Sequence, residues 1–169
     1  AWTLYCSYSP ANWSGYAGFK APEYIPIRDF SARNKDGVRD FLVRFSAGLA
    51  EISRHYARII CPEGGAEVAK GEAVWLRKLL NVGNIANFLP IMVAARKKVT
   101  SGGITETDYI EILKALECYA YRVFLFSGRR SNAGKSRLYR LGYDLFSYSL
   151  SAEKVVNDLH QLLLHYSRD

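Results

Sequence analysis

The chain has 169 residues, of which 49% are hydrophobic, and this size and composition favour one packed domain over a disordered segment. Its longest uninterrupted apolar run, residues 88–95, is far shorter than the roughly 20 residues that cross a bilayer, so we expect no membrane partner. No basic segment followed by an apolar one opens the chain, so we expect no export. The formal net charge of +7 favours an anionic partner or an acidic neighbouring domain.

Residues 1–34 are rich in Tyr, Trp, Gly, Pro and Ser and show neither helical nor strand periodicity. We expect an irregular segment there, or the end of a preceding domain. The sequence starts with Ala1 rather than Met, and we therefore expect a piece of a longer protein. Residues 35–169 are predicted to form one helical bundle domain.

The first predicted helix carries apolar residues at every third or fourth position over residues 38–59. Asn34 or Asp36 is expected to cap it, and Pro62 is expected to end it. A second helix fits residues 66–81 and a third fits residues 84–99.

Pro90 lies inside the third helical pattern. Because proline is tolerated in a first turn but disrupts a helix interior, the helix either kinks there or starts late, at Asn87. The sequence leaves both alternatives open.

The most regular helical pattern begins at Thr105, and two more helices follow. Ser131 or Asn132 is expected to cap the first of these, and Ser151 the second. Six helices with short connections and almost no strand signal predict an all-α bundle. The apolar face of the pattern that begins at Thr105 comprises Tyr109, Ile112, Leu113, Leu116, Tyr119, Ala120, Val123, Phe124 and Phe126.

Gly134, Lys135 and Ser136 read like the end of a phosphate-binding P-loop. The first glycine of that motif would stand at position 129, which is Arg129, and Gly128 comes one residue too early. A P-loop also follows a buried strand, whereas this segment follows a helical pattern. We therefore expect no nucleotide hydrolysis here.

The stretch between Glu117 and Asp144 contains six basic residues and no acidic one. The simpler interpretation is a solvated loop between helices with exposed arginines. The alternative is an anion-binding turn in which these cations contact DNA phosphates. The six candidate residues are Arg122, Arg129, Arg130, Lys135, Arg137 and Arg140.

Glu117 is predicted to lie on the apolar side of its helix. A buried carboxylate needs a partner, so Glu117 is a candidate for a structural ion pair with a cation of the following loop. The alternative is a hydrated position at the rim of the core.

The cysteines and histidines indicate neither a metal site nor a catalytic site. Three cysteines lie far apart without a CxxC motif, and we expect buried free thiols in a reducing, cytoplasmic compartment. His160 and His165 are five residues apart and His55 is alone, a spacing that does not suit a helical metal site. The cysteines are Cys6, Cys61 and Cys118.

Residues 41–146 resemble the helical region of GmrSD-type proteins, which are modification-dependent restriction endonucleases used in phage defence. In that family a long helix that ends in Glu, an aromatic residue and Arg leads into a turn with Gly and Asn and then into another helix. The matching residues here are Glu117, Tyr119, Tyr121, Arg122, Gly128 and Asn132.

The resemblance implies a parent protein with a ParB-like domain that hydrolyses a nucleoside triphosphate and, often, an HNH-type nuclease that uses a divalent metal. Neither active site is in this sequence: residues 36–39 fall one residue short of the Asp-Gly-x-x-Arg motif, and no His-Asn pair occurs. The resemblance thus implies a helical scaffold without a cofactor or catalytic residue of its own. It would couple the two catalytic domains of its parent chain and contact DNA. The alternative is a protein-interaction module whose basic face binds an acidic partner domain.

Overall fold

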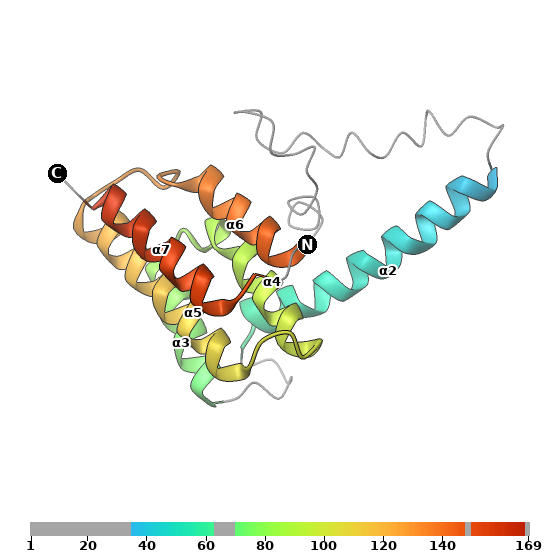
Figure 1. Ribbon diagram of the computed structural model, residues 1–169, viewed down its shortest axis with the longest axis horizontal. Coiled ribbons are helices and arrows are strands. Elements are labelled where there is room, and N and C mark those ends of the chain that lie inside the picture. Colours follow the sequence, from blue (N-terminus) through green and yellow to red (C-terminus); the bar gives the residue numbers. More distant parts are fainter. Residues whose placement is uncertain (1–34, 63–69, 148–149, 168–169) are drawn as a thin grey trace.

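The computed structural model describes residues 35–62, 70–147 and 150–167. Within these ranges the chain forms six α-helices and no strand, so the all-α prediction is confirmed (Figure 1). The expectations for residues 1–34 and for the start of the second helix lie outside them. The helices are α2 (Lys35–Ile60), α3 (Lys70–Val82), α4 (Leu89–Thr100), α5 (Glu106–Tyr119), α6 (Lys135–Ser147) and α7 (Ala152–Tyr166).

Helices α4 and α5 form the centre of the bundle. Helix α6 packs mainly on α4, whereas α3 and α7 pack on α5. Helix α2 reaches α4 with its C-terminal half, and its other end extends past the bundle (Figure 1). Accordingly Ile52 and Ile59 are buried, while Val43 is 62% exposed.

Pro90 occupies the first turn of α4, so this helix starts late and does not kink. A short 3-10 turn, Ile85–Asn87, precedes it. Proline fits the first turn because the amide hydrogen that it lacks would have no helical acceptor there.

The predicted cap of α7 is confirmed, and Thr105, where the helical pattern was predicted to begin, is the cap of α5. The amide of Asp108 donates to Thr105 Oγ1 (3.1 Å) and the amide of Thr105 donates to Asp108 Oδ2 (3.0 Å), which makes a capping box. The amide of Lys154 donates to Ser151 Oγ (3.2 Å).

The predicted start of α6 is wrong by about one turn. The helix begins at Lys135, because residues 131–134 form a hydrogen-bonded turn instead of the first helical turn. In this turn the amide of Ala133 donates to the carbonyl of Arg130 (2.9 Å).

Helix α5 continues into a π-helix, Ala120–Phe126. The wider helix keeps Ala120, Val123 and Phe124 in the core, but it places Phe126 in solvent with 83% of its surface exposed. The prediction that Phe126 extends the buried face is therefore wrong. A straight α-helical periodicity does not describe residues beyond 119.

Four charged residues from four helices form an alternating chain that runs from the interior, at Glu72 and Arg96, to the surface, at Glu106. Arg58 of α2 donates to Glu72 of α3 from Nε (3.2 Å) and Nη2 (2.6 Å). Arg96 of α4 reaches the same carboxylate at 3.5 Å and donates to both oxygens of Glu106 of α5 (2.8 and 2.7 Å). Glu72 is fully buried and Arg96 is 7% exposed, so these charges depend on one another for solvation.

Of the two alternatives for Glu117, the structure fits the hydrated position at the rim of the core: the residue is half-buried, and among the described residues no cation pairs with it. The fully buried carboxylate is that of Glu72. The prediction of buried thiols does not fit the structure. Cys61 is exposed rather than buried, because it lies just beyond the end of α2, and Cys118 is partly buried.

Helix α6 approaches α4 closely at a glycine. A Cβ atom at Gly142 would lie 2.7 Å from Pro90 Cβ and 3.0 Å from the amide nitrogen of Ile91. Because Gly142 has no side chain, α6 can lie close against α4. The same contact positions the basic residues that α6 carries.

We expect Gly142→Ala to lower the free energy of unfolding by about 1–3 kcal/mol, because the added methyl group must push α6 away from backbone atoms. Gly71→Ala in α3 is the control, since its methyl group would meet only the tip of Ile110, at 3.3 Å. Urea denaturation followed by circular dichroism measures both. Equal stabilities for the two variants would contradict the close contact.

We expect Glu72→Gln to cost about 3 kcal/mol, because it leaves Arg58 and Arg96 facing a neutral group in the interior. The matched control is Glu111→Gln, whose ion pair with Lys114 is exposed and should contribute less than about 1 kcal/mol. Urea denaturation followed by circular dichroism measures the stability of both variants. A loss at Glu72 as small as that at Glu111 would show that the buried chain of charges does not hold the helices.

Candidate functional site

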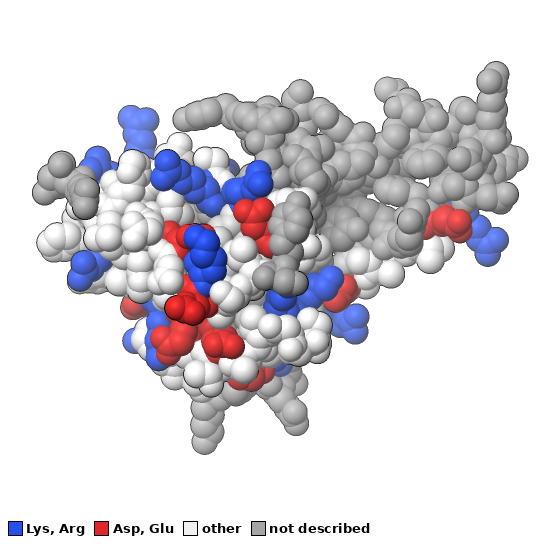
Figure 2. Space-filling model, viewed as in Figure 1, with Lys and Arg blue, Asp and Glu red and all other residues white. Residues whose placement is uncertain are grey.

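The six cations singled out in the sequence are all exposed, and we refer to them together as the basic edge. They are Arg122 on the π-helix, Arg129 and Arg130 in the turn that follows, and Lys135, Arg137 and Arg140 on α6. Figure 2 shows Lys and Arg side chains along the upper rim of the molecule, over this turn and α6. Asp and Glu side chains lie mostly below them, and some of these adjoin Lys or Arg, as Asp144 does with Arg140.

Side-chain hydrogen bonds with three other parts of the chain hold the turn between the π-helix and α6. Burial raises the pKa of Tyr119 above its ordinary value, so its hydroxyl stays a hydrogen-bond donor in alkaline solution as well as at neutral pH. Because the turn is fixed from three sides, its cations are positioned before any partner arrives. The bonds run from Tyr119 Oη to the carbonyl of Ala133 (3.2 Å), from Asn87 Nδ2 to the carbonyl of Ser131, and from Arg129 Nε to the carbonyl of Tyr166 (3.1 Å).

Gly134 lets the turn close against the bundle. Its φ of +69° is a left-handed conformation, and a Cβ atom there would lie 2.4 Å from Tyr119 Oη and 3.1 Å from Tyr166 Cε2. A side chain at this position would therefore break the hydrogen bond of Tyr119 as well as strain the backbone.

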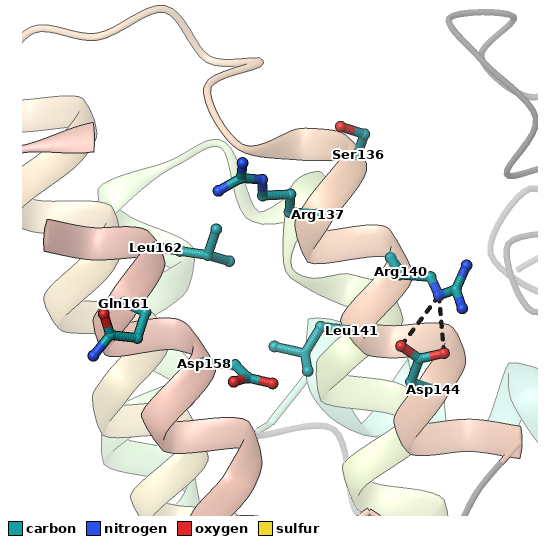
Figure 3. Close-up of a pocket in the computed structure, with 8 residues that line it drawn as sticks. All are labelled: Ser136, Arg137, Arg140, Leu141, Asp144, Asp158, Gln161 and Leu162. Atoms are coloured by element: carbon teal, nitrogen blue, oxygen red, sulfur yellow. Dashed lines mark hydrogen bonds and ion pairs between the residues drawn. The ribbon is translucent and has the colours of Figure 1, made fainter. Parts of the chain in front are cut away.

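A cleft of about 450 Å³ lies between α6 and α7, beside the basic edge. Figure 3 shows Leu141 and Leu162 pointing into it from opposite helices, with Arg137 above them and Asp158 at the other end. The cleft therefore combines an apolar floor with charges of opposite sign. Its lining residues are Ser136, Arg137, Arg140, Leu141, Asp144, Asp158, Gln161 and Leu162.

The carboxylates of the cleft are already engaged in ion pairs. Arg140 Nε donates to both oxygens of Asp144 (3.0 and 3.1 Å), and Lys154 Nζ donates to Asp158. The eight lining residues include no histidine, cysteine or lysine. This set suits recognition of a ligand by ionic contacts and hydrogen bonds, with the guanidinium of Arg137 as the cation nearest the apolar floor (Figure 3).

Sequence reasoning singled out two residues that line the cleft, both from α6 and both as candidate contacts to DNA, and it singled out none from α7. Arg137 and Arg140 stand in a conspicuous cluster of cations, whereas Asp158 and Gln161 look like ordinary residues on the polar side of an amphipathic helix. Nothing local to α7 indicates that this side faces α6. The fold also confirms the context expected for Gly128: it follows a helix rather than a strand.

Neither a scan against models of protein families nor searches of curated proteins and of solved structures find a match to this chain. Among the residues that the structure describes, no helix is both long and apolar enough to cross a membrane. In the same residues, no group of three His, Cys, Asp or Glu side chains is placed to hold a metal ion.

We expect Gly134→Ala to lower the free energy of unfolding by about 2–4 kcal/mol, because it combines backbone strain with a collision against Tyr119. Gly128→Ala is the matched control. Gly128 also has a positive φ, of +58°, but open space surrounds it, so only the strain of about 1–2 kcal/mol applies. Thermal and urea denaturation of both variants test this difference, and equal losses would show that the contact with Tyr119 is unimportant.

Proposed function

We propose that this helical domain contacts the phosphodiester backbone of DNA through the basic edge and serves as a non-catalytic module of a larger protein. The observation that carries the proposal is the exposure of all six cations in a stretch without a single acidic residue. Contacts of arginine and lysine with phosphates are independent of base sequence.

The fixed turn supports the proposal. Ordering a loop on binding costs free energy, whereas the hydrogen bonds to Ala133, Ser131 and Tyr166 already restrict the backbone of this segment. Arg130 and Arg137 make no ion pair with another described residue. Binding therefore does not require these two guanidinium groups to leave a carboxylate first.

The resemblance of residues 41–146 to the GmrSD-type helical region supports a further step of the proposal. In that setting the domain belongs to a cytoplasmic phage-defence nuclease and couples a ParB-like nucleotide-hydrolysing domain to an HNH-type nuclease domain. The nucleotide and the divalent metal then bind to those other domains. The full reading frame tests this step directly, because it must encode both flanking domains.

We expect wild-type protein to bind duplex DNA with an affinity that falls steeply with salt concentration, because cations that neutralise phosphates release counterions. Replacing four cations of the basic edge by Ala should reduce the slope of log K against log salt by up to about 3.6, at about 0.9 per phosphate contact. The four are Arg129, Arg130, Lys135 and Arg137. Fluorescence anisotropy over a salt series measures both slopes.

The control variant removes the same charge elsewhere, at four exposed cations of α2 and α3. We expect it to keep the wild-type slope, because these side chains lie outside the basic edge. Wild-type binding without any salt dependence would exclude the contact with DNA and leave an acidic partner domain as the occupant of the basic edge. The control positions are Arg39, Arg54, Arg77 and Lys78.

A further inference from the structure

The π-helix exposes large apolar side chains beside the basic edge. Phe126 is 83% exposed, and Tyr121 and Leu125 are each 55% exposed. Exposed hydrophobic residues occur singly on most proteins, but three on one short helix form a patch that calls for an explanation. In the described part of the chain, the packing of the helices does not explain why these three side chains are exposed.

The helix geometry gathers these side chains on one side. The amide of Ser127 donates to the carbonyl of Arg122 (2.9 Å), five residues back, and in such a helix residues four and five apart lie nearly above one another. Tyr121, Leu125 and Phe126 therefore share the outer face with Arg122. The opposite face is anchored in the core.

An aromatic cluster makes that anchor rigid. Phe124 lies 5.7 Å from Tyr119 and 6.0 Å from Phe88, measured between ring centroids, and Tyr119 meets Phe88 edge-on at 6.0 Å. Tyr119 also bonds the following turn at Ala133. The exposed rings and the cations of the turn are thus attached to the same fixed framework.

The chemistry of the patch favours one kind of occupant. Two of its three members are aromatic, and three arginines, Arg122, Arg129 and Arg130, flank them without an acidic residue. Aromatic rings alternating with cations suit unpaired nucleic acid, because bases stack on the rings while phosphates contact the cations. A duplex offers the cations the same phosphates but hides the faces of its bases.

We propose that the domain binds single-stranded nucleic acid, with bases stacked on Phe126 and Tyr121 and the phosphates on Arg122, Arg130 and Arg137. This inference rests on the proposed contact with phosphodiesters and adds a preference for unpaired strands. The strand would run from the π-helix along the turn toward α6.

The test compares a fluorescent 20-nucleotide single strand of mixed, non-self-complementary sequence with its duplex. We expect Phe126→Ala to weaken binding of the single strand roughly tenfold, the effect of losing one stacked base. Affinity for the duplex should change less than about twofold, and the salt slope for the single strand should stay unchanged because no cation is lost.

Two further variants separate stacking from general hydrophobicity. Phe126→Trp should preserve affinity for the single strand, and its added tryptophan fluorescence should be quenched by the bases; Phe126→Leu should behave like Phe126→Ala. Leu164→Ala, at a 46% exposed apolar position on α7, is the control and should bind both nucleic acids like wild type. All five proteins are compared by anisotropy at one salt concentration, and a salt series on wild type and Phe126→Ala gives the two slopes.

Several outcomes would overturn the inference. The inference is wrong if Phe126→Ala binds the single strand as tightly as wild type does, or if the variant weakens binding of the strand and of the duplex equally. In either case the rings do not stack on bases, and the proposed contact with phosphates is unaffected. If the same variant instead loses binding to vesicles of phosphatidylserine and phosphatidylcholine, with unchanged affinity for the strand, the patch is a membrane contact. Binding of neither nucleic acid by wild type would reject the proposed function itself.

Discussion

The alternating chain of Arg58, Glu72, Arg96 and Glu106 is the constraint on which the rest of the bundle depends. Each member comes from a different helix, and Glu72 can be buried only because cations approach it from two sides. A shift of one helix by a turn would leave a charge in the interior without its partner. In our interpretation apolar burial supplies most of the stability, while these charges select the register in which α2, α3, α4 and α5 meet.

On this framework the remaining helices bring the basic edge into position. Gly142 allows α6 to lie directly against the first turn of α4, where Pro90 sits. The turn before α6 is closed by Gly134 and bonded by Tyr119, so the cations on both sides of it share one rigid support. A cluster of like charges is costly only when it is desolvated or crowded. Here the six side chains are exposed to water.

The π-helix links the two proposals physically. Phe124 and Phe126 are two residues apart and lie on opposite sides of this helix, with Phe124 inside and Phe126 outside. The inner aromatic residues hold the segment in place, and the outer ones stand next to Arg122 and the turn. Charge and aromatic surface are adjacent because both lie on the outer side of one anchored segment.

The sequence by itself determined the class of the fold, most helix limits and the identity of the six cations, because helical periodicity, caps such as Thr105 and Ser151, and runs of charge are local properties. It could not determine that Glu72 rather than Glu117 is the buried carboxylate, since that depends on where cations from distant helices arrive. Nor could it place Phe126 in solvent or assign Asp158 to a cleft with Arg137. Those outcomes follow from the change of helical pitch after position 119 and from the packing of α7 beside α6, which only the tertiary structure decided.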